Sequence, residues 1–191
     1  GLVGDDGPTH HGVFDIAYLR PLPHIVVMAP RDEAMLVNML HTAISHDGPA
    51  ALRYPRGAGI GVELPDEPEL IPLGTGETLV SGEGVALLGY GSGVKVALEA
   101  AELLAERGIK ATVADARFVK PLDTEMVERL ALGHDLLVTI EEGVLQGGFG
   151  SAVREHVEGS FATAAGRAKV MRVGLPDRYV THGKPDLLHK E

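Results

Sequence analysis

The sequence contains no cysteine in its 191 residues, so disulfide bonds and thiolate metal sites are excluded. Basic residues are also scarce, because 17 Lys and Arg stand against 27 Asp and Glu and give a formal net charge of −10. General binding to nucleic acid or to an anionic membrane needs a cationic surface, so the composition argues against both partners. The absence of cysteine does not indicate whether the protein works in a reducing or an oxidising compartment, and we expect a cytoplasmic protein.

Long apolar runs are absent too. No segment approaches the roughly 18 apolar residues that indicate a membrane-spanning helix, and no charged and then apolar leader begins the sequence. Residue 1 is Gly instead of Met, which is consistent with processing or truncation. The hydrophobic content of 45% is ample for the cores of one large or two small domains.

The densest group of chemically active side chains lies in residues 4–12, Gly-Asp-Asp-Gly-Pro-Thr-His-His-Gly. In this loop Asp6 can accept a hydrogen bond and His10 can transfer a proton, while the glycines allow a ligand to approach the backbone. An Asx-type turn, in which the carboxylates cap backbone amides, is the alternative. A functional loop normally follows a strand that positions it, and here that strand is absent, so we expect the chain to be the back part of a larger protein.

Hydrophobic periodicity predicts two α/β units. Residues 24–28, 32–46 and 50–54 read as strand, helix and strand, with the length of a right-handed crossover between parallel strands. From there the composition shifts to Pro, Gly and Glu. We therefore expect a first unit over residues 1–57, a linker with a short hairpin over 58–83 and a second unit over 84–191.

The second unit alternates strands and helices along its length. Such alternation predicts a mainly parallel sheet with helices on both faces. Residues 117–123 read as a loop in which Asp123 opens a helix. The expected strands are 85–89, 111–115, 136–140 and 169–173, and the expected helices are 93–107, 123–132 and 147–157, with the possible start of one more near Pro185.

Three further patterns allow a functional and a plain structural interpretation. Arg56 follows a strand at the edge where open α/β sheets bind ligands, and its guanidinium suits a phosphate or carboxylate, although it can equally be a solvated surface arginine. The Gly89–Gly93 turn with Asp115 imitates a dinucleotide fingerprint, but its third glycine comes one place early and a tight turn suffices. The adjacent Glu141 and Glu142 favour capping and turn roles over a shared proton.

Seven motifs occur in order over nearly the whole chain, at residues 4–15, 18–23, 53–57, 116–123, 141–143, 147–150 and 174–177. Together they closely resemble the 1-deoxy-D-xylulose-5-phosphate synthases of the transketolase-like superfamily. The resemblance implies a thiamine diphosphate and magnesium enzyme that decarboxylates pyruvate and joins the two-carbon fragment to D-glyceraldehyde 3-phosphate, for isoprenoid, thiamine and pyridoxal synthesis. It also implies a partial pyrimidine-binding domain followed by a transketolase C-terminal-like, mainly parallel α/β domain.

The resemblance also implies roles for three residues. Asp6 and His10 match catalytic residues near the reacting carbons, and Arg56 matches the residue that binds the acceptor phosphate. The family's cofactor-binding and magnesium-binding residues have no counterpart in this chain, so we expect it to be inactive alone, with the missing N-terminal part as its partner and a homodimer as the whole protein. The alternatives are a non-catalytic association or regulatory fragment and a β-like subunit of a 2-oxo acid dehydrogenase, against which Arg53–Gly57 argues.

Overall fold

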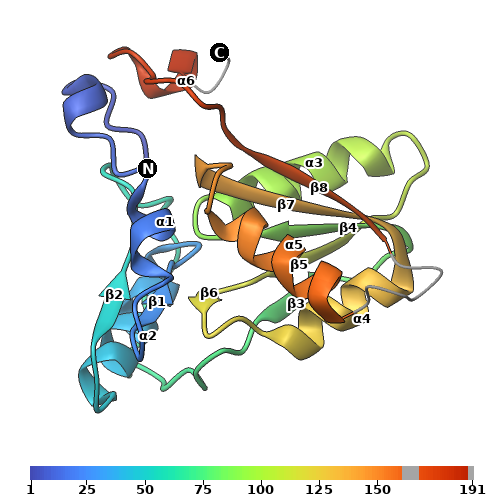
Figure 1. Cartoon of the computed structure of the whole chain (residues 1–191), viewed down its shortest axis with the longest axis horizontal. Helices are drawn as coiled ribbons and strands as arrows, with labels where there is room; N and C mark the ends of the chain where they lie inside the picture. Colours follow the sequence, from blue (N-terminus) through green and yellow to red (C-terminus); the bar gives the residue numbers. More distant parts are fainter. Residues whose placement is uncertain (161–167, 189–191) are drawn as a thin grey trace.

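The computed structural model describes residues 1–160 and 168–188, and these form two sheets (Figure 1). In the smaller sheet β1 (Val26–Met28) pairs in parallel with β2 (Ala50–Leu52). Helix α2 (Glu33–Ser45) connects them, and its N-cap Asp32 accepts a hydrogen bond from the Met35 amide at 2.7 Å. The predicted strand, helix and parallel strand are therefore confirmed.

The third strand of the smaller sheet corrects a prediction. Residues 117–123, expected to be a loop, contain β6 (Phe118–Lys120), which pairs antiparallel with β1. Phe118 is fully buried, so this short apolar run contributes to the core. The pairing partner lies far away in the sequence, and local periodicity could not identify it.

The larger sheet has the strand order β3-β5-β4-β7-β8. Its four strands β5, β4, β7 and β8 run parallel, whereas β3 pairs antiparallel with β5 at the edge. The expected hairpin within residues 58–83 is wrong, because β3 finds its partner in β5 instead of in a neighbouring segment. The strands are β3 (Glu77–Val80), β4 (Gly84–Gly89), β5 (Thr112–Asp115), β7 (His134–Val144) and β8 (Lys169–Leu175).

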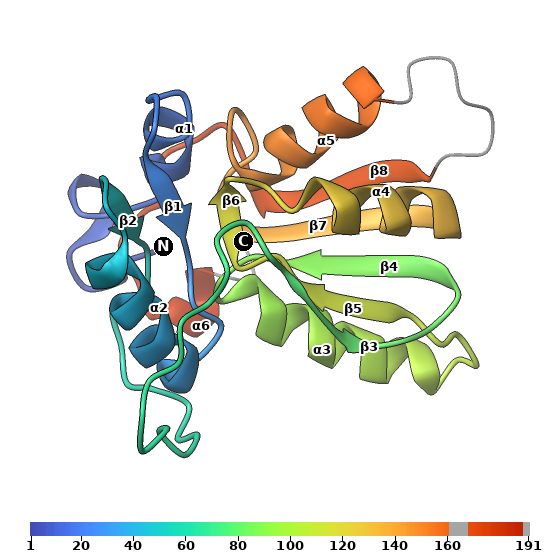
Figure 2. The same cartoon turned by 90° about the horizontal axis from the view of Figure 1, so that it is seen from below.

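Helices cover both faces of the larger sheet, as predicted. Figure 2 shows α3 (Gly93–Ala105) on one side and α4 (Thr124–Gly133) with α5 (Phe149–Ser160) on the other. The alternation of side chains along the strands explains the arrangement, since Leu87 packs in the cluster under α3 while Leu88 packs under α4 and α5. Asp123 caps α4 by accepting from the Met126 amide at 2.8 Å, which confirms its predicted role.

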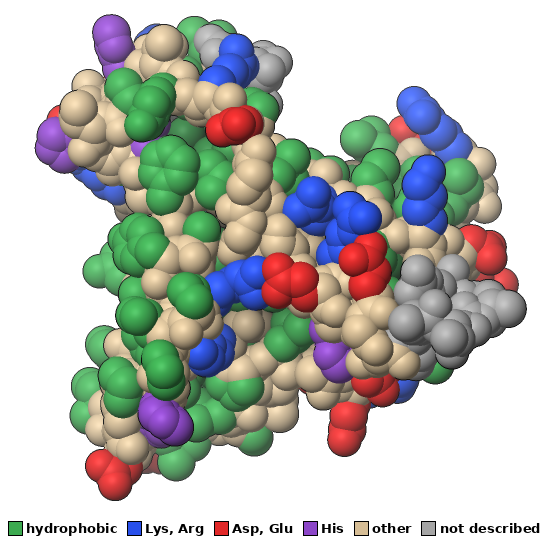
Figure 3. All heavy atoms as spheres, in the orientation of Figure 1, with side chains coloured by type: hydrophobic (Ala, Val, Ile, Leu, Met, Phe, Trp, Pro, Cys, Tyr) green, Lys and Arg blue, Asp and Glu red, His purple; other side chains and the backbone are tan. Residues whose placement is uncertain are grey.

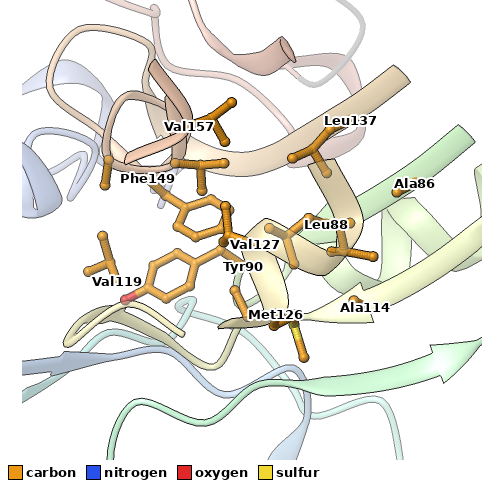
Figure 4. Packing of buried hydrophobic residues seen from close by; sticks show 14 of the residues in the cluster. Ala86, Leu88, Tyr90, Ala114, Val119, Met126, Val127, Leu137, Phe149 and Val157 are labelled. Carbon is orange, nitrogen blue, oxygen red and sulfur yellow. The ribbon is translucent and has the colours of Figure 1, made fainter. Parts of the chain in front are cut away.

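The core beside α4 and α5 extends to the smaller sheet. The rings of Tyr90 and Phe149 stack with their centroids 5.0 Å apart, and Val119 from β6 lies next to them (Figure 4). Val27 of β1 belongs to the same cluster. One continuous apolar core thus holds the two sheets together.

The C-terminal end of the described chain lies beside the N-terminal loop. After β8 it crosses to the opening loop, where α6 (Pro185–Leu188) lies near the 3₁₀ helix η1 (Gly7–Thr9) (Figure 1). A separate apolar cluster joins Leu2 and Val13 to Val180 and Leu188. Helix α1 (Asp15–Leu19) follows the loop and leads toward the smaller sheet. Within the described residues, no helix has both the length and the apolar character to cross a membrane.

Candidate functional site

The opening loop folds around η1 and presents Asp6 and His10 at the surface. Gly7 adopts a φ of +72°, a conformation that favours glycine, and its amide donates to the Val3 carbonyl at 2.9 Å. Asp6 and His10 are both exposed on either side of this turn. Figure 3 shows histidine side chains at the surface of the lobe that carries the loop. Asp6 stands at the N-cap of η1, but its side chain makes no cap hydrogen bond there. The alternative interpretation, in which the carboxylates cap backbone amides, is therefore not what the structure shows for Asp6.

The two adjacent histidines point in different directions. His10 Nδ1 lies 2.9 Å from the Thr9 hydroxyl on the exposed side. His11 instead faces inward, where its Nδ1 accepts from the Val3 amide at 2.8 Å and its Nε2 lies 3.1 Å from the Val180 carbonyl. His10 is therefore the one that can reach a ligand, and His11 holds the chain.

Asp6 and Arg56 meet, although 50 residues separate them in the sequence. Arg56 Nη1 donates to Asp6 Oδ2, and the two side chains keep 64% and 36% of their surface exposed. An exposed ion pair of this kind contributes about 0–1 kcal/mol to stability. Within the described part of the chain, no hydrogen bond joins His10 to either residue.

Arg53 is the residue that the sequence interpretation missed. It is 9% exposed, and its Nε donates to Asp15 Oδ2 at 2.7 Å. Its Nη2 donates to the carbonyl of Gly12 at 3.0 Å and also to the carbonyl of Glu142. The sequence offers only a partial signal for it: Arg53 directly follows the apolar strand β2 and Asp15 follows the opening loop, but the sequence does not show that the two meet.

Glu141 has the capping role that was predicted, whereas Glu142 connects two distant segments instead. Glu141 is buried at the N-terminus of α5, where it accepts from the amides of Phe149 and Gly150, each at 2.8 Å. Burial raises the pKa of Glu141 even though these amides favour the carboxylate. Glu142 accepts from the Leu2 amide at 2.8 Å and the Ser92 hydroxyl at 2.9 Å, so it links the start of the loop to the second unit.

The Gly89–Gly93 segment is a tight turn. A side chain on Gly93 would collide with the Ile140 carbonyl, so the glycine is required where α3 meets β7. Asp115 has no exposed surface, and it accepts from the Arg117 amide at 2.9 Å and from Arg31 at 3.0 Å. Burial raises the pKa of Asp115. A carboxylate so enclosed is not available to a ribose hydroxyl.

A cleft of about 290 Å³ lies between the start of α2, the start of α3 and the segment after Arg53. Its lining includes Leu36, Tyr54 and Lys95. Glu33 holds one wall by accepting from the Ile60 and Gly61 amides at 3.1 and 2.6 Å. None of the three predicted site residues lines this cleft. The described residues contain no group of three or more acids and histidines that could share a metal ion.

Known proteins resemble the chain along its whole length. The family model of the transketolase C-terminal domain matches residues 74–191, and that of the transketolase pyrimidine binding domain matches residues 1–60. The 1-deoxy-D-xylulose-5-phosphate synthase 1 of Geobacter sulfurreducens is 57% identical over 96% of this chain, and the 1-deoxy-D-xylulose-5-phosphate synthase of Heliobacterium modesticaldum is 50% identical over 100%. The chain spans only 28% and 29% of the lengths of these two relatives.

Solved structures show the same fold. A protein described as a split gene transketolase, inactive beta4 tetramer, superposes with a TM-score of 0.86 at 32% identity, covering 96% of this chain and 58% of that one. A Pichia stipitis transketolase mutant superposes with a TM-score of 0.70 at 22% identity, covering 98% of this chain and 26% of the other. This last likeness concerns the fold alone.

The contrast between Arg53 and Arg56 gives a prediction on stability. We expect Arg53→Met to lower the free energy of unfolding by about 3–5 kcal/mol, because it leaves the part-buried Asp15 carboxylate and two carbonyls without their donor. Arg56→Met removes an exposed pair and serves as the matched control, with an expected loss of about 0–1 kcal/mol. Urea unfolding followed by circular dichroism measures both. Equal losses for the two variants would contradict the structural role of Arg53.

Proposed function

The chain belongs to the transketolase family, and from that premise we propose that it is the C-terminal part of a 1-deoxy-D-xylulose-5-phosphate synthase. Such an enzyme condenses pyruvate, with loss of carbon dioxide, and D-glyceraldehyde 3-phosphate. The observation that carries the proposal is the meeting of Asp6 and Arg56, because the fold brings together two residues that the sequence motifs single out separately. The names of the relatives with 57% and 50% identity support it.

Arg56 is proposed to bind the phosphate of the aldehyde acceptor. Its guanidinium is exposed, and among the described residues it pairs with Asp6, in an interaction that contributes little to stability. A phosphate dianion offers the same fork of hydrogen bonds with more charge, so it can take the place of the Asp6 carboxylate. Asp6 is then released toward the substrate, beside the proposed position of the reacting carbons.

His10 is proposed to exchange a proton with the substrate's hydroxyl or carbonyl group. The ring is exposed on the same loop as Asp6, and its Nδ1 is engaged by the Thr9 hydroxyl. That contact leaves Nε2 for the substrate. An imidazole nitrogen can accept or donate a proton, which suits it to both directions of proton transfer.

The cofactor is proposed to bind mainly outside this chain. Thiamine diphosphate supplies the group that accepts electrons when pyruvate loses carbon dioxide, and it is held through a metal ion that needs oxygen ligands. The described residues offer no cluster of acids for such an ion, so the residues present do not fit that part of the site. The proposed partner is therefore the N-terminal part of the protein, and the proposed assembly is a homodimer of the whole.

An association module is the second candidate function. A similar protein of 32% identity is described as an inactive beta4 tetramer of a split gene transketolase. By analogy, we propose as the second candidate function that this chain associates with copies of itself and has no activity of its own.

We expect the chain to be inactive alone and to form an active complex with the separately produced N-terminal part. The reason is that Asp6, His10 and Arg56 are present, whereas metal ligands for the cofactor are not found among the described residues. The assay measures product formation from pyruvate and D-glyceraldehyde 3-phosphate, with native mass spectrometry of the same samples. A stable complex without activity would favour the association module, and transfer to lipoamide would favour the dehydrogenase subunit.

In the complete protein, Arg56→Ala should raise the KM for D-glyceraldehyde 3-phosphate by about 10- to 100-fold, since a charged hydrogen bond contributes about 1.5–3 kcal/mol. The KM for pyruvate should change little. Arg154→Ala removes another exposed arginine, which pairs with Glu158 on α5, and provides the control. Steady-state kinetics with each substrate varied separately gives both constants. An unchanged KM for the aldehyde would rule out the proposed phosphate contact.

His10→Ala should lower kcat by about 100-fold or more in the complete protein, because general acid–base catalysis typically contributes that much. Its effect on folding should be small, since the side chain is exposed. His41→Ala, on α2, is the control for loss of a histidine outside the loop. Single-turnover measurement of the carbon–carbon bond-forming step locates the defect. Wild-type rates in that step would remove His10 from the mechanism.

A further inference from the structure

His11, near the end of the opening loop, faces the segment that follows β8. Its Nδ1 accepts a hydrogen bond from the Val3 amide at 2.8 Å, and its Nε2 lies 3.1 Å from the Val180 carbonyl, which can only accept. Both contacts form together only in the neutral ring with its proton on Nε2, because an imidazolium has no lone pair for the Val3 amide. The geometry thus determines the tautomer.

Other contacts also join the opening loop to the segment that follows β8. The Gly183 amide donates to the Gly4 carbonyl at 2.9 Å. Leu2 and Val13 pack with Val180 in the apolar cluster described above. A methyl group added to Gly7 would lie 2.9 Å from the His182 Cβ, so the backbone of η1 touches the segment directly. The loop is therefore docked on residues 176–188 from both ends, with His11 bridging the two.

The docking matters because the loop carries the candidate site. Asp6 and His10 lie within five residues of His11. They belong to residues 3–11, whose first and last residues are joined by the hydrogen bond from Val3 to His11, and His11 in turn contacts Val180. Arg56, in contrast, comes from the segment after β2, and its side chain donates to Asp6. A loss of docking should therefore displace Asp6 and His10 while leaving the backbone position of Arg56 unchanged.

We propose that His11 is a positioning residue: its neutral ring fixes the loop that carries Asp6 and His10 to the segment 176–188. The kinetic consequence of this proposal rests on the proposed function, whereas its structural consequence does not. A misplacement of about 1 Å costs on the order of 100-fold in rate, so the expected effect is on kcat.

Two variants distinguish the effect of the His11 hydrogen bonds from the effect of the packing of its ring. His11→Phe keeps a flat ring but removes both hydrogen bonds, and we expect amide hydrogen exchange in residues 3–12 of the full-length protein to become at least about tenfold faster. His11→Gln retains one acceptor and one donor and should restore most of the protection. His41→Phe on α2 is the control and should leave exchange in the loop unchanged.

Two further measurements complete the test. Nitrogen NMR of the wild-type protein with labelled histidine should show His11 protonated on Nε2 and unprotonated on Nδ1. In the activity assay, His11→Phe should lower kcat by about 100-fold with little change in the KM for the phosphorylated aldehyde, and His11→Gln should recover it. This pattern differs from that of Arg56→Ala, which acts on the KM.

The proposal is overturned if His11→Gln is as damaging as His11→Phe, if the ring carries its proton on Nδ1, or if exchange in residues 3–12 does not change. It is also overturned if the wild-type protein is active and His11→Phe keeps its kcat. A wild-type protein without the proposed activity would instead contradict the proposed function. The exchange and NMR results would still decide the role of His11.

Discussion

Arg53 places a guanidinium in the interior, where its Nε and Nη2 donate to three acceptors on two other segments of the chain. They are the carboxylate of Asp15 at the start of α1, the carbonyl of Gly12 at the end of the site loop and the carbonyl of Glu142 in β7. An uncompensated charge at that position would be very costly, so the three segments must meet around it. This one requirement brings the loop, the smaller sheet and the larger sheet to a common point.

A second charged group connects the two sheets on the other side of the core. Arg31, which follows β1, donates to Glu77 of β3 at 2.6 Å and to the buried Asp115 of β5 at 3.0 Å. Arg117 also donates to Glu77. Although burial opposes ionisation of Glu77, the hydrogen bond from Arg31 and the charge of Arg117 hold its pKa below the usual value. Since Arg31 follows a strand of the smaller sheet while Glu77 and Asp115 lie on strands of the larger one, the network resists sliding of one sheet past the other.

Local signals in the sequence identified the elements that depend on local interactions. Asp123 caps the helix that follows it, and the alternation of strands and helices in the second unit indicated a sheet covered on both faces. Pairings between distant segments were not accessible in this way. The strand Phe118–Lys120 exists because β1 offers it an edge, and β3 adds to β5 for the same reason. In the site, the motifs named Asp6, His10 and Arg56, but the burial of Arg53 follows only from the three-dimensional meeting of Asp15, Gly12 and Glu142.

The segment Arg53–Gly57 therefore combines two arginines of opposite physical character. Arg53 lies in the interior, where its Nε and Nη2 donate to acceptors of the protein itself. Arg56 is three residues further on, beyond the end of β2, where its guanidinium is exposed and its pair with Asp6 is easily exchanged. The buried arginine fixes the backbone from which the exposed one extends. A weak ion pair on a rigid support is what a reversible phosphate site requires, because the support limits the entropy lost on binding while the pair adds only a small cost.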